Sequence, residues 1–421
     1  MEKLFFELLQ VAIGTRDSLS RVPSSLEWQQ LLELSKKQAL TAVAFHGVKT
    51  LSDSRIKNDG SGDGFDGGIG IDEMTYLKWL GLTAKVAQRN KVLDEQCREV
   101  CEVLEHDGFH TWVLKGQANQ DLYPENLREF RTPGDIDVWV RPMGEIPLAV
   151  EVGTGCVEYV NYTGKEAVIR YVLLNTPEGK RKAVMNDMRQ HHIDYHYYKD
   201  TAVEVHFTPS YFQSPIKNRR LQRWFGDHEE DCHVSSLGFK VGSVGFNAVY
   251  QMIHVYKHLF NEGVGLRQLL DYYFVLRALH IAQGDLSDRT QSMAQWAEDM
   301  GISVPSNTEI VQTLGRFGMK RFAGGVMWVL KEVFAMPDVY LLCEPNEVAG
   351  RFLLDEILMS GNFGKYDERN RKMQGASKLK RFFLLSQRNW RFFKQYPSEV
   401  FWDPFRRAYN VIWRKLEMWR Y

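Results

Sequence analysis

Apolar side chains recur at helical spacing through the first quarter of the chain. Residues 24–27, Ser-Ser-Leu-Glu, have the pattern of a capping box, in which a serine and a glutamate three residues later satisfy free N–H groups at the start of a helix. An apolar stripe follows at helical spacing, and a second stripe predicts a long helix from about residue 73 to residue 105. We therefore expect residues 1–107 to form a helical region.

A stretch that is half glycine, residues 59–70, separates the two stripes and predicts a turning surface loop. Its first residues, from Asp59 to Gly64, resemble the beginning of an EF-hand calcium loop. Such a loop needs a bidentate glutamate at its twelfth position, where this chain has Gly70. We therefore interpret the stretch as a linker.

After residue 107 the apolar residues no longer recur at helical spacing, and they alternate with polar residues as in β-strands. Residues 110–114 predict a short strand, and residues 135–140 predict another, because Asp135 and Asp137 alternate with Ile136 and Val138 as in a half-buried strand. A hairpin is expected from two further runs, residues 193–198 and 202–207, and a helix near residues 165–174. Helical patterns then return at residues 246–261, 265–283, 288–300, 307–335 and 346–360.

These patterns predict an α+β protein. Because the chain has 421 residues, it is too long for one ordinary core, and two or three domains are expected. We expect a core with a small mixed β-sheet and helices on one side at residues 108–242. A helical region would precede it at residues 1–107, and another would follow it at residues 243–421.

The overall composition narrows the class of protein. Apolar residues make up 44% and charged residues 25%, and 53 basic residues balance 53 acidic ones, so no overall charge indicates a partner. No uncharged apolar run approaches the roughly 20 residues that cross a bilayer, so we expect no membrane partner. Five scattered cysteines argue against a disulfide framework and favour a cytoplasmic location. Two of them, Cys97 and Cys101, are interpreted as small apolar residues.

Positive charge is concentrated at the C-terminal end. Residues 369–421 contain 14 basic and 3 acidic residues, and aromatic residues lie between the cations. Aromatic rings among cations suit a single-stranded nucleic acid, which would be the partner of this tail. The alternative is an amphipathic helical tail packed on the rest of the chain, and we favour that alternative.

The strand that begins at Asp135 carries the strongest chemical signal. Alternate residues of a strand point to one face, so Asp135 and Asp137 project side by side while Ile136 and Val138 turn into the core. Two adjacent carboxylates repel each other, and a folded protein tolerates them best with a cation between them. Carboxylate oxygens suit Mg²⁺, with Mn²⁺ as the alternative.

Glu204 and His206 share one face of a later predicted strand. If that strand lies beside the strand of Asp135, Glu204 completes a cluster of three carboxylates. Such a cluster can hold two metal ions, one at an attacking hydroxyl and one at a leaving pyrophosphate. His206 would then face the substrate.

Lys115 and Gly116 follow the first predicted strand, at a turn where free backbone N–H groups suit a phosphate. Lys115 and Arg131 would add positive charge against a triphosphate. Each also has a structural interpretation: Lys115 extends its stem at a strand end, and Arg131 pairs with a nearby acid.

The histidines of the chain do not have the pattern of a zinc site. His191, His192, His196 and His206 lie near the predicted hairpin, and His254 and His258 lie four apart on a predicted helix. A hydrolytic zinc helix has a glutamate beside its first histidine, where this chain has Val255. We interpret these residues as packing or surface histidines.

Several of these motifs together resemble the uncharacterised nucleotidyltransferase family. Leu114-Lys115-Gly116, Leu122-Tyr123-Pro124, Arg131 and Gly134-Asp135-Ile136-Asp137 occur in the order of that family's motifs. Residues 203–207 are similar to its Glu-Leu-His-Trp segment, and residues 265–271 resemble a segment further downstream.

The resemblance implies a polymerase-β-type sheet, metal-dependent nucleotidyl transfer and Glu204 as the third carboxylate. The phosphate loop departs from the broader pattern, because Gln117 stands where a serine or glycine is usual and seventeen residues separate it from Asp135.

We therefore expect the chain to move a nucleoside monophosphate from an NTP to an acceptor hydroxyl on a small molecule, a protein or RNA. Two Mg²⁺ ions would assist it. The alternative is a non-catalytic member of the same fold that binds a nucleotide or nucleic acid, and a metal-dependent phosphohydrolase is a third hypothesis. The expected catalytic and metal-binding residues are Asp135, Asp137 and Glu204, and the expected substrate contacts are Lys115, Gly116, Arg131 and His206.

Overall fold

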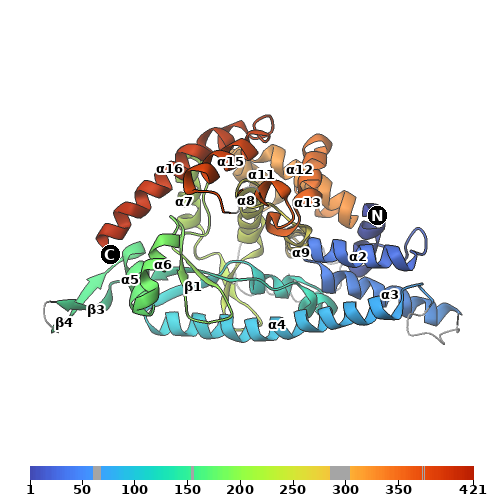
Figure 1. Cartoon of the computed structure of the whole chain (residues 1–421), viewed down its shortest axis with the longest axis horizontal. Coiled ribbons are helices and arrows are strands. Elements are labelled where there is room, and N and C mark those ends of the chain that lie inside the picture. The colour runs from blue at the N-terminus through green and yellow to red at the C-terminus, as the bar shows by residue number, and fades with distance from the viewer. Residues whose placement is uncertain (60–67, 153–155, 285–303, 372, 374) are drawn as a thin grey trace. The chain divides into compact units, whose positions relative to one another are not determined.

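The computed structural model of the chain describes residues 1–59, 68–152, 156–284, 304–371, 373 and 375–421. The helix expected at 288–300 and most of the linker at 59–70 lie outside these residues. The chain forms two compact units. Their helices and strands are labelled in Figure 1. Unit 1 comprises residues 1–92, 119–133 and 247–377, and unit 2 comprises residues 93–118, 134–246 and 378–421. The division of the chain at 107 and 242 stays a prediction.

The described part of unit 1 is helical. Its α-helices are α1 (Glu2–Ala12), α2 (Ser25–Lys37), α3 (Thr41–Asp59), most of α8 (Val244–Asn261), α9 (Leu266–Ala282), α11 (Asn307–Arg316), α12 (Lys320–Phe334), α13 (Glu347–Ser360) and α14 (Glu368–Arg371). Its 3₁₀ helices are most of η1 (Gly116–Leu122), η2 (Glu125–Phe130), η3 (Asp338–Tyr340) and η4 (Asn362–Gly364). The long helix α4 (Glu73–His106) belongs to unit 1 up to residue 92 and to unit 2 from residue 93.

Most helices lie where the apolar pattern predicts them. The predicted capping box is present at the start of α2: Ser24 Oγ accepts the N–H of Glu27 at 3.4 Å, and the Glu27 carboxylate accepts the N–H of Ser24 at 2.9 Å. The prediction of one helix over 307–335 is wrong, because the chain turns between α11 and α12. Gly318 in this turn has a φ of +73°, a conformation that glycine adopts without steric cost.

Unit 2 is built around a mixed sheet of six strands in the order β5-β6-β2-β1-β8-β7. Strand β2 pairs antiparallel with β1 and parallel with β6, and β6 pairs antiparallel with β5, which confirms the expected hairpin. A separate hairpin, β3-β4, was not predicted. The strands are β1 (Phe109–Val113), β2 (Ile136–Pro142), β3 (Ile146–Val152), β4 (Cys156–Tyr162), β5 (His192–Tyr195), β6 (Val203–His206), β7 (Cys232–Val234) and β8 (Lys240–Gly242).

Helices cover one face of the six-stranded sheet, and the expected α+β class is confirmed. The helices of unit 2 besides α4 are α5 (Gly164–Leu174), α6 (Glu178–Asp187), α7 (Pro215–Asp227), α15 (Lys378–Trp390) and α16 (Pro397–Arg420). Apolar residues of α4, α5 and α6 pack against alternate residues of the strands, among them Val138 and Val205. Cys97 and Cys101 of α4 lie in this core, and burial raises the pKa of both thiols, that of Cys101 to about 12.

The opposite face of the sheet is divided between rings and charges. Trp112 and Trp139 lie side by side with ring centroids 4.6 Å apart, and Phe225 of α7 packs on Trp139. The remaining part of this face, along β2, β6 and β5, carries polar residues, of which the alternation predicts those on β2 and β6. Among the described residues, no helix combines the length and the apolar character needed to cross a membrane.

Candidate active site

The register between β2 and β6 places the predicted carboxylates together. Asp137 lies opposite Glu204, and Trp139 lies opposite His206, so all four side chains share one face of the sheet. Asp135 stands directly before β2, two residues from Asp137, and is on that same side. Ligand atoms of Asp137, Glu204 and His206 all lie within 4.8 Å of one another.

Lys115 supplies the cation that the two aspartates need. It follows the end of β1, and its Nζ lies 2.9 Å from Oδ1 of Asp135 and also contacts Oδ2 of Asp137. Burial lowers the pKa of the Lys115 ammonium, but the charges of Asp135, Asp137 and Glu204 outweigh burial and raise it. The lysine therefore stays charged, and the repulsion that we expected between the aspartates is already balanced within the protein.

Two histidines fix the position of Glu204. Nε2 of His206 lies 3.0 Å from Oδ1 of Asp137 and 3.3 Å from Oε2 of Glu204, and Nδ1 of His192 lies 2.8 Å from the same Glu204 oxygen. Burial raises the pKa of the Glu204 carboxyl, but the close contacts with both histidines outweigh burial and hold that pKa well below its usual range. Glu204 is therefore ionised.

The two imidazoles respond differently to burial. Burial lowers the pKa of both rings. For His206 the hydrogen bonds to Asp137 and Glu204 prevail and raise its pKa, whereas for His192 burial prevails and the pKa falls. Of the two imidazoles, His206 is thus the one whose protonated form is favoured by its carboxylate neighbours. The prediction that His206 faces the substrate is not tested by these contacts.

Asp194 and the position of His192 in this site were not predicted from the sequence. In the antiparallel pair of β5 and β6, His192 lies opposite His206 and Asp194 lies opposite Glu204, so both residues extend the polar face. Burial raises the pKa of Asp194. The signal was present in the sequence, since His192 and Asp194 alternate with the apolar Ile193, but the predicted strand began one residue too late.

Arg131 has a partner within unit 1. Its Nε and Nη2 donate to the two oxygens of Asp271 at 2.7 and 2.8 Å, and the Tyr123 hydroxyl donates to the same carboxylate at 2.7 Å. Arg131 and Asp271 are both buried. Arg131 therefore pairs with a nearby acid, as the structural alternative for this residue expected. A contact between Arg131 and the substrate stays a prediction.

Gly116 stands at the turn that directs the chain from β1 into η1. Its φ of +67° is unfavourable for residues with a Cβ, which explains a glycine here. The next residue, Gln117, donates from Nε2 to Asp94 of α4 at 2.6 Å. Gln117, which replaces the usual serine or glycine of the phosphate loop, thus has a partner within the protein. A contact between Gly116 and phosphate stays a prediction.

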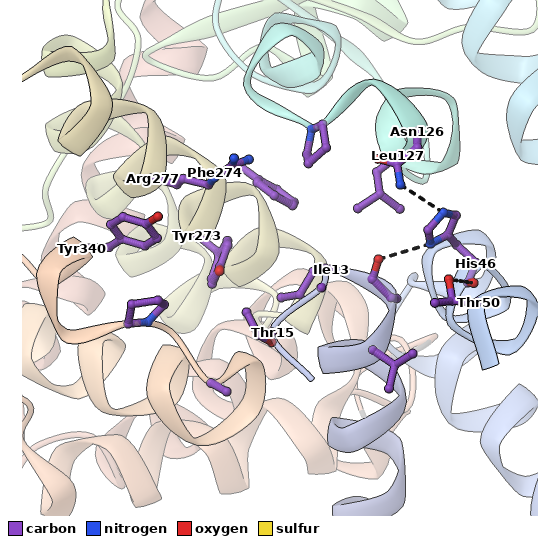
Figure 2. A pocket seen from close by; sticks show the side chains of 16 residues that line it. Ile13, Thr15, His46, Thr50, Asn126, Leu127, Tyr273, Phe274, Arg277 and Tyr340 are labelled. Carbon is purple, nitrogen blue, oxygen red and sulfur yellow. Dashed lines mark hydrogen bonds between the residues drawn. The ribbon is translucent and has the colours of Figure 1, made fainter. Parts of the chain in front are cut away.

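A cavity of about 570 Å³ lies in unit 1 and is lined by residues of α1, α3, η2, α9 and η3 (Figure 2). His46 borders it, but its ring already contacts the Ala12 carbonyl at 3.2 Å and the Asn126 side chain at 3.3 Å. Thr15 donates its hydroxyl to the Phe334 carbonyl at 2.9 Å. Because these polar groups are satisfied within the protein, we assign the cavity no ligand.

Comparison with known proteins gives a family. Residues 24–296 match the model of a family described as uncharacterised nucleotidyltransferase. The matched segment is well over half of the chain and contains Lys115, both aspartates, Glu204 and His206. Searches among curated proteins and among solved structures found no match.

Proposed function

The chain belongs to the uncharacterised nucleotidyltransferase family, and we propose that it moves a nucleoside monophosphate from an NTP to an acceptor hydroxyl. The observation that carries the proposal is the register of β2 with β6, which sets Asp137 beside Glu204 and close to Asp135. These three residues are the proposed catalytic residues. The acceptor would be a small molecule, a protein or RNA.

The donor atoms at this site fit divalent metal ions. Carboxylate oxygens of Asp135, Asp137 and Glu204 are the kind of ligand that Mg²⁺ and Mn²⁺ prefer. The carboxylates attract positive charge, as the Lys115 ammonium against both aspartates shows, and a metal ion bound there would replace that ammonium. Two bound Mg²⁺ ions, or Mn²⁺ in their place, would activate the acceptor hydroxyl and neutralise the leaving pyrophosphate.

Residues next to the carboxylates would orient them and bind the NTP. His206 orients Asp137 and Glu204 through its contacts with both side chains. Lys115, charged and largely buried, would turn from the aspartates to a phosphate oxygen of the NTP, where a charge-assisted hydrogen bond replaces the ion pair. Gly116 and Arg131 stay predicted substrate contacts.

A second candidate is a non-catalytic member of the family that binds a nucleotide. Two observations favour it. The Lys115 ammonium already balances the negative charge of the two aspartates. Gln117, in the loop that departs from the usual phosphate-loop sequence, donates a hydrogen bond to Asp94. A metal-dependent phosphohydrolase is a third candidate, with water in place of the acceptor hydroxyl.

We also propose a cytoplasmic location. Four cysteines in the described part of the chain, Cys97, Cys101, Cys232 and Cys343, are free thiols. Free thiols are typical of a reducing compartment. The assignment concerns location only and does not bear on the reaction.

Calorimetry separates the first two candidates. The protein is titrated with Mn²⁺ and then with each NTP, and the same mixture with a cell extract is assayed for pyrophosphate. An enzyme binds metal and NTP and releases pyrophosphate once an acceptor is supplied, whereas a binding module retains the NTP intact. Asp135→Asn, a change at a partly exposed side chain, should weaken Mn²⁺ binding about tenfold or more, because one charged ligand is lost.

The exposed Asp187→Asn is the matched control and should bind Mn²⁺ as the wild type does. Equal Mn²⁺ affinity for wild type and Asp135→Asn would remove Asp135 from the metal site and contradict the proposal.

A further inference from the structure

Helix α16 carries an apolar stripe on its outward face. Its six members recur at three- and four-residue spacing, which places them on one side of a helix. The side chain of Trp419 is 93% exposed and that of Leu416 is 67% exposed. The stripe consists of Phe401, Phe405, Tyr409, Ile412, Leu416 and Trp419, all of them exposed.

Helix α15 contacts α16 within unit 2 (Figure 1). It has a stripe of the same kind. Leu379, Phe383 and Trp390 are exposed and lie at helical spacing on one side of α15. A soluble surface rarely gathers so many large apolar side chains, and a large exposed patch usually marks an interaction site.

The opposite face of α16 is packed, and it holds the acidic residues of these helices. Glu399 is 2% exposed and accepts the N–H of Gln213 at 2.8 Å, and its carboxylate lies 3.3 Å from Nζ of Lys217. Asp403 is fully buried and pairs with Arg407.

The third acid, Glu417, lies 3.1 Å from Lys165 of α5, and its side chain is only 12% exposed. Glu399, Asp403 and Glu417 are the only acidic residues between 378 and 421. The exposed faces of α15 and α16 therefore present no fully exposed carboxylate.

Cations flank the two stripes. Lys380 on α15, Lys394 after it, and Lys415 on α16 are exposed. Residues 378–421 contain 11 basic residues against the 3 inward-facing acids. The outward surface of this helix pair is thus cationic and apolar at once. We call it the tail surface.

We propose that the tail surface, the outward face of α15 and α16, docks on an anionic lipid bilayer. An amphipathic helix with aromatic and aliphatic residues on one face and lysines and arginines beside them lies in the interfacial plane of a membrane. Its apolar face enters the boundary of the acyl chains, while the cations attract anionic headgroups. The tail surface offers both components and no fully exposed acid to repel the headgroups.

The composition of the stripe distinguishes a bilayer from other occupants. A single-stranded nucleic acid stacks its bases on flat rings, and Leu379, Ile412 and Leu416 offer no ring. A second copy of the chain would bring an identical cationic surface, and like charges in contact disfavour such pairing. Hydrocarbon, in contrast, accommodates aliphatic and aromatic side chains equally.

This inference departs from the expectation of no membrane partner. That expectation rested on the lack of a spanning segment, and in the described residues no spanning helix is found. Surface docking needs none. The sequence shows the positive charge of the tail, but only the fold shows that Glu399, Asp403 and Glu417 turn inward.

The test is sedimentation of the full chain with lipid vesicles. One set is pure phosphatidylcholine, and the other contains equal amounts of phosphatidylcholine and phosphatidylglycerol. We expect the wild type to bind the anionic vesicles at least about tenfold more tightly, and to be released by high salt, which screens surface charge. Two triple variants, Phe405→Ser/Leu416→Ser/Trp419→Ser and Lys380→Glu/Lys394→Glu/Lys415→Glu, should each lose about tenfold or more in affinity.

Matched controls change the same kinds of residue elsewhere. Leu26→Ser/Met74→Ser/Val348→Ser alters three exposed apolar side chains outside the tail, and Lys85→Glu/Lys91→Glu/Lys365→Glu reverses three exposed lysines. Both should bind vesicles as the wild type does. Trp419→Ala, at a side chain that is 93% exposed, keeps the test decisive if a triple variant does not fold, since it should weaken binding without affecting the fold.

Three results would overturn the proposal. One is failure of the wild type to bind anionic vesicles at low salt. Another is binding of a labelled single-stranded RNA at low salt without binding of vesicles, which would favour the nucleic-acid interpretation of the tail. The last is a dimer, seen by analytical ultracentrifugation, that the apolar triple variant disperses while vesicle binding is unchanged.

Discussion

At the scale of single residues, the central feature is a lysine in a place suited to a metal ion. Lys115 contacts Asp135 and Asp137, and its charge is stabilised there because the carboxylates outweigh the effect of burial on its pKa. A divalent ion that binds the same two carboxylates must displace this ammonium. Lys115 and the metal therefore compete for the aspartates in the protein without substrate.

Replacing Lys115 by an uncharged residue of similar length tests this competition. Lys115→Met should raise the affinity for Mn²⁺ about tenfold or more, because a positive charge a few ångströms from the ligands is removed. Titration calorimetry measures the affinity, and Lys85→Met, at an exposed lysine, serves as the control. Unchanged or weaker Mn²⁺ binding by Lys115→Met would show that the lysine does not compete with the ion.

The alternation of polar and apolar residues predicts the carboxylates of this site, but it does not predict which residues contact Lys115 and Arg131. The two-residue period of strands placed Asp135 and Asp137 on one face of their strand, and the prediction that Glu204 joins them depended on the two strands being neighbours. The partner of Lys115 was not predictable, because this lysine fits a phosphate as well as a carboxylate. The buried pair of Arg131 with Asp271 joins residues far apart in the chain, and spacing gives no information on such contacts.

At the scale of elements, local signals predicted helices better than strand pairing. The capping box and the apolar stripe located α2, because both act between residues a few positions apart. The parallel pairing of β2 with β6 and the β3-β4 hairpin depend on tertiary packing. Strand order in the sheet cannot be derived from the alternation pattern of each strand.

The cap of α2 gives a direct prediction at this scale. Ser24→Ala removes the side-chain oxygen that accepts the N–H of Glu27 and should lower the free energy of unfolding by about 1 kcal/mol. Denaturant unfolding measures the change. Ser25→Ala, at the neighbouring exposed serine inside the helix, is the matched control and should cost much less. If both variants unfold alike, the hydrogen bond of Ser24 does not stabilise α2.

At the scale of the whole molecule, the units are assembled from interleaved segments. Unit 2 takes residues 93–118, 134–246 and 378–421, so the C-terminal helices belong with the sheet and not with the helices that precede them in sequence. Patterns along the sequence divide the chain into contiguous regions. They cannot show that a C-terminal segment packs with an earlier part of the chain. The family match ends at residue 296, and the tail surface therefore lies outside the matched segment.

We propose Asp135, Asp137 and Glu204 as the site of nucleotidyl transfer. Transfer of this kind depends on positioning and on charge neutralisation, because the protein contributes little covalent chemistry. Loss of both aspartates should therefore remove metal binding and catalysis together.

The measurement that tests this site is release of pyrophosphate from pooled NTPs, in the presence of Mg²⁺ and a cell extract that supplies the acceptor. The wild type should release pyrophosphate, and Asp135→Ala/Asp137→Ala should reduce the rate on the order of a thousandfold or more. Asp187→Ala is the control, and a circular dichroism spectrum verifies that each variant is folded. Release that continues unchanged in a folded Asp135→Ala/Asp137→Ala variant would contradict the account.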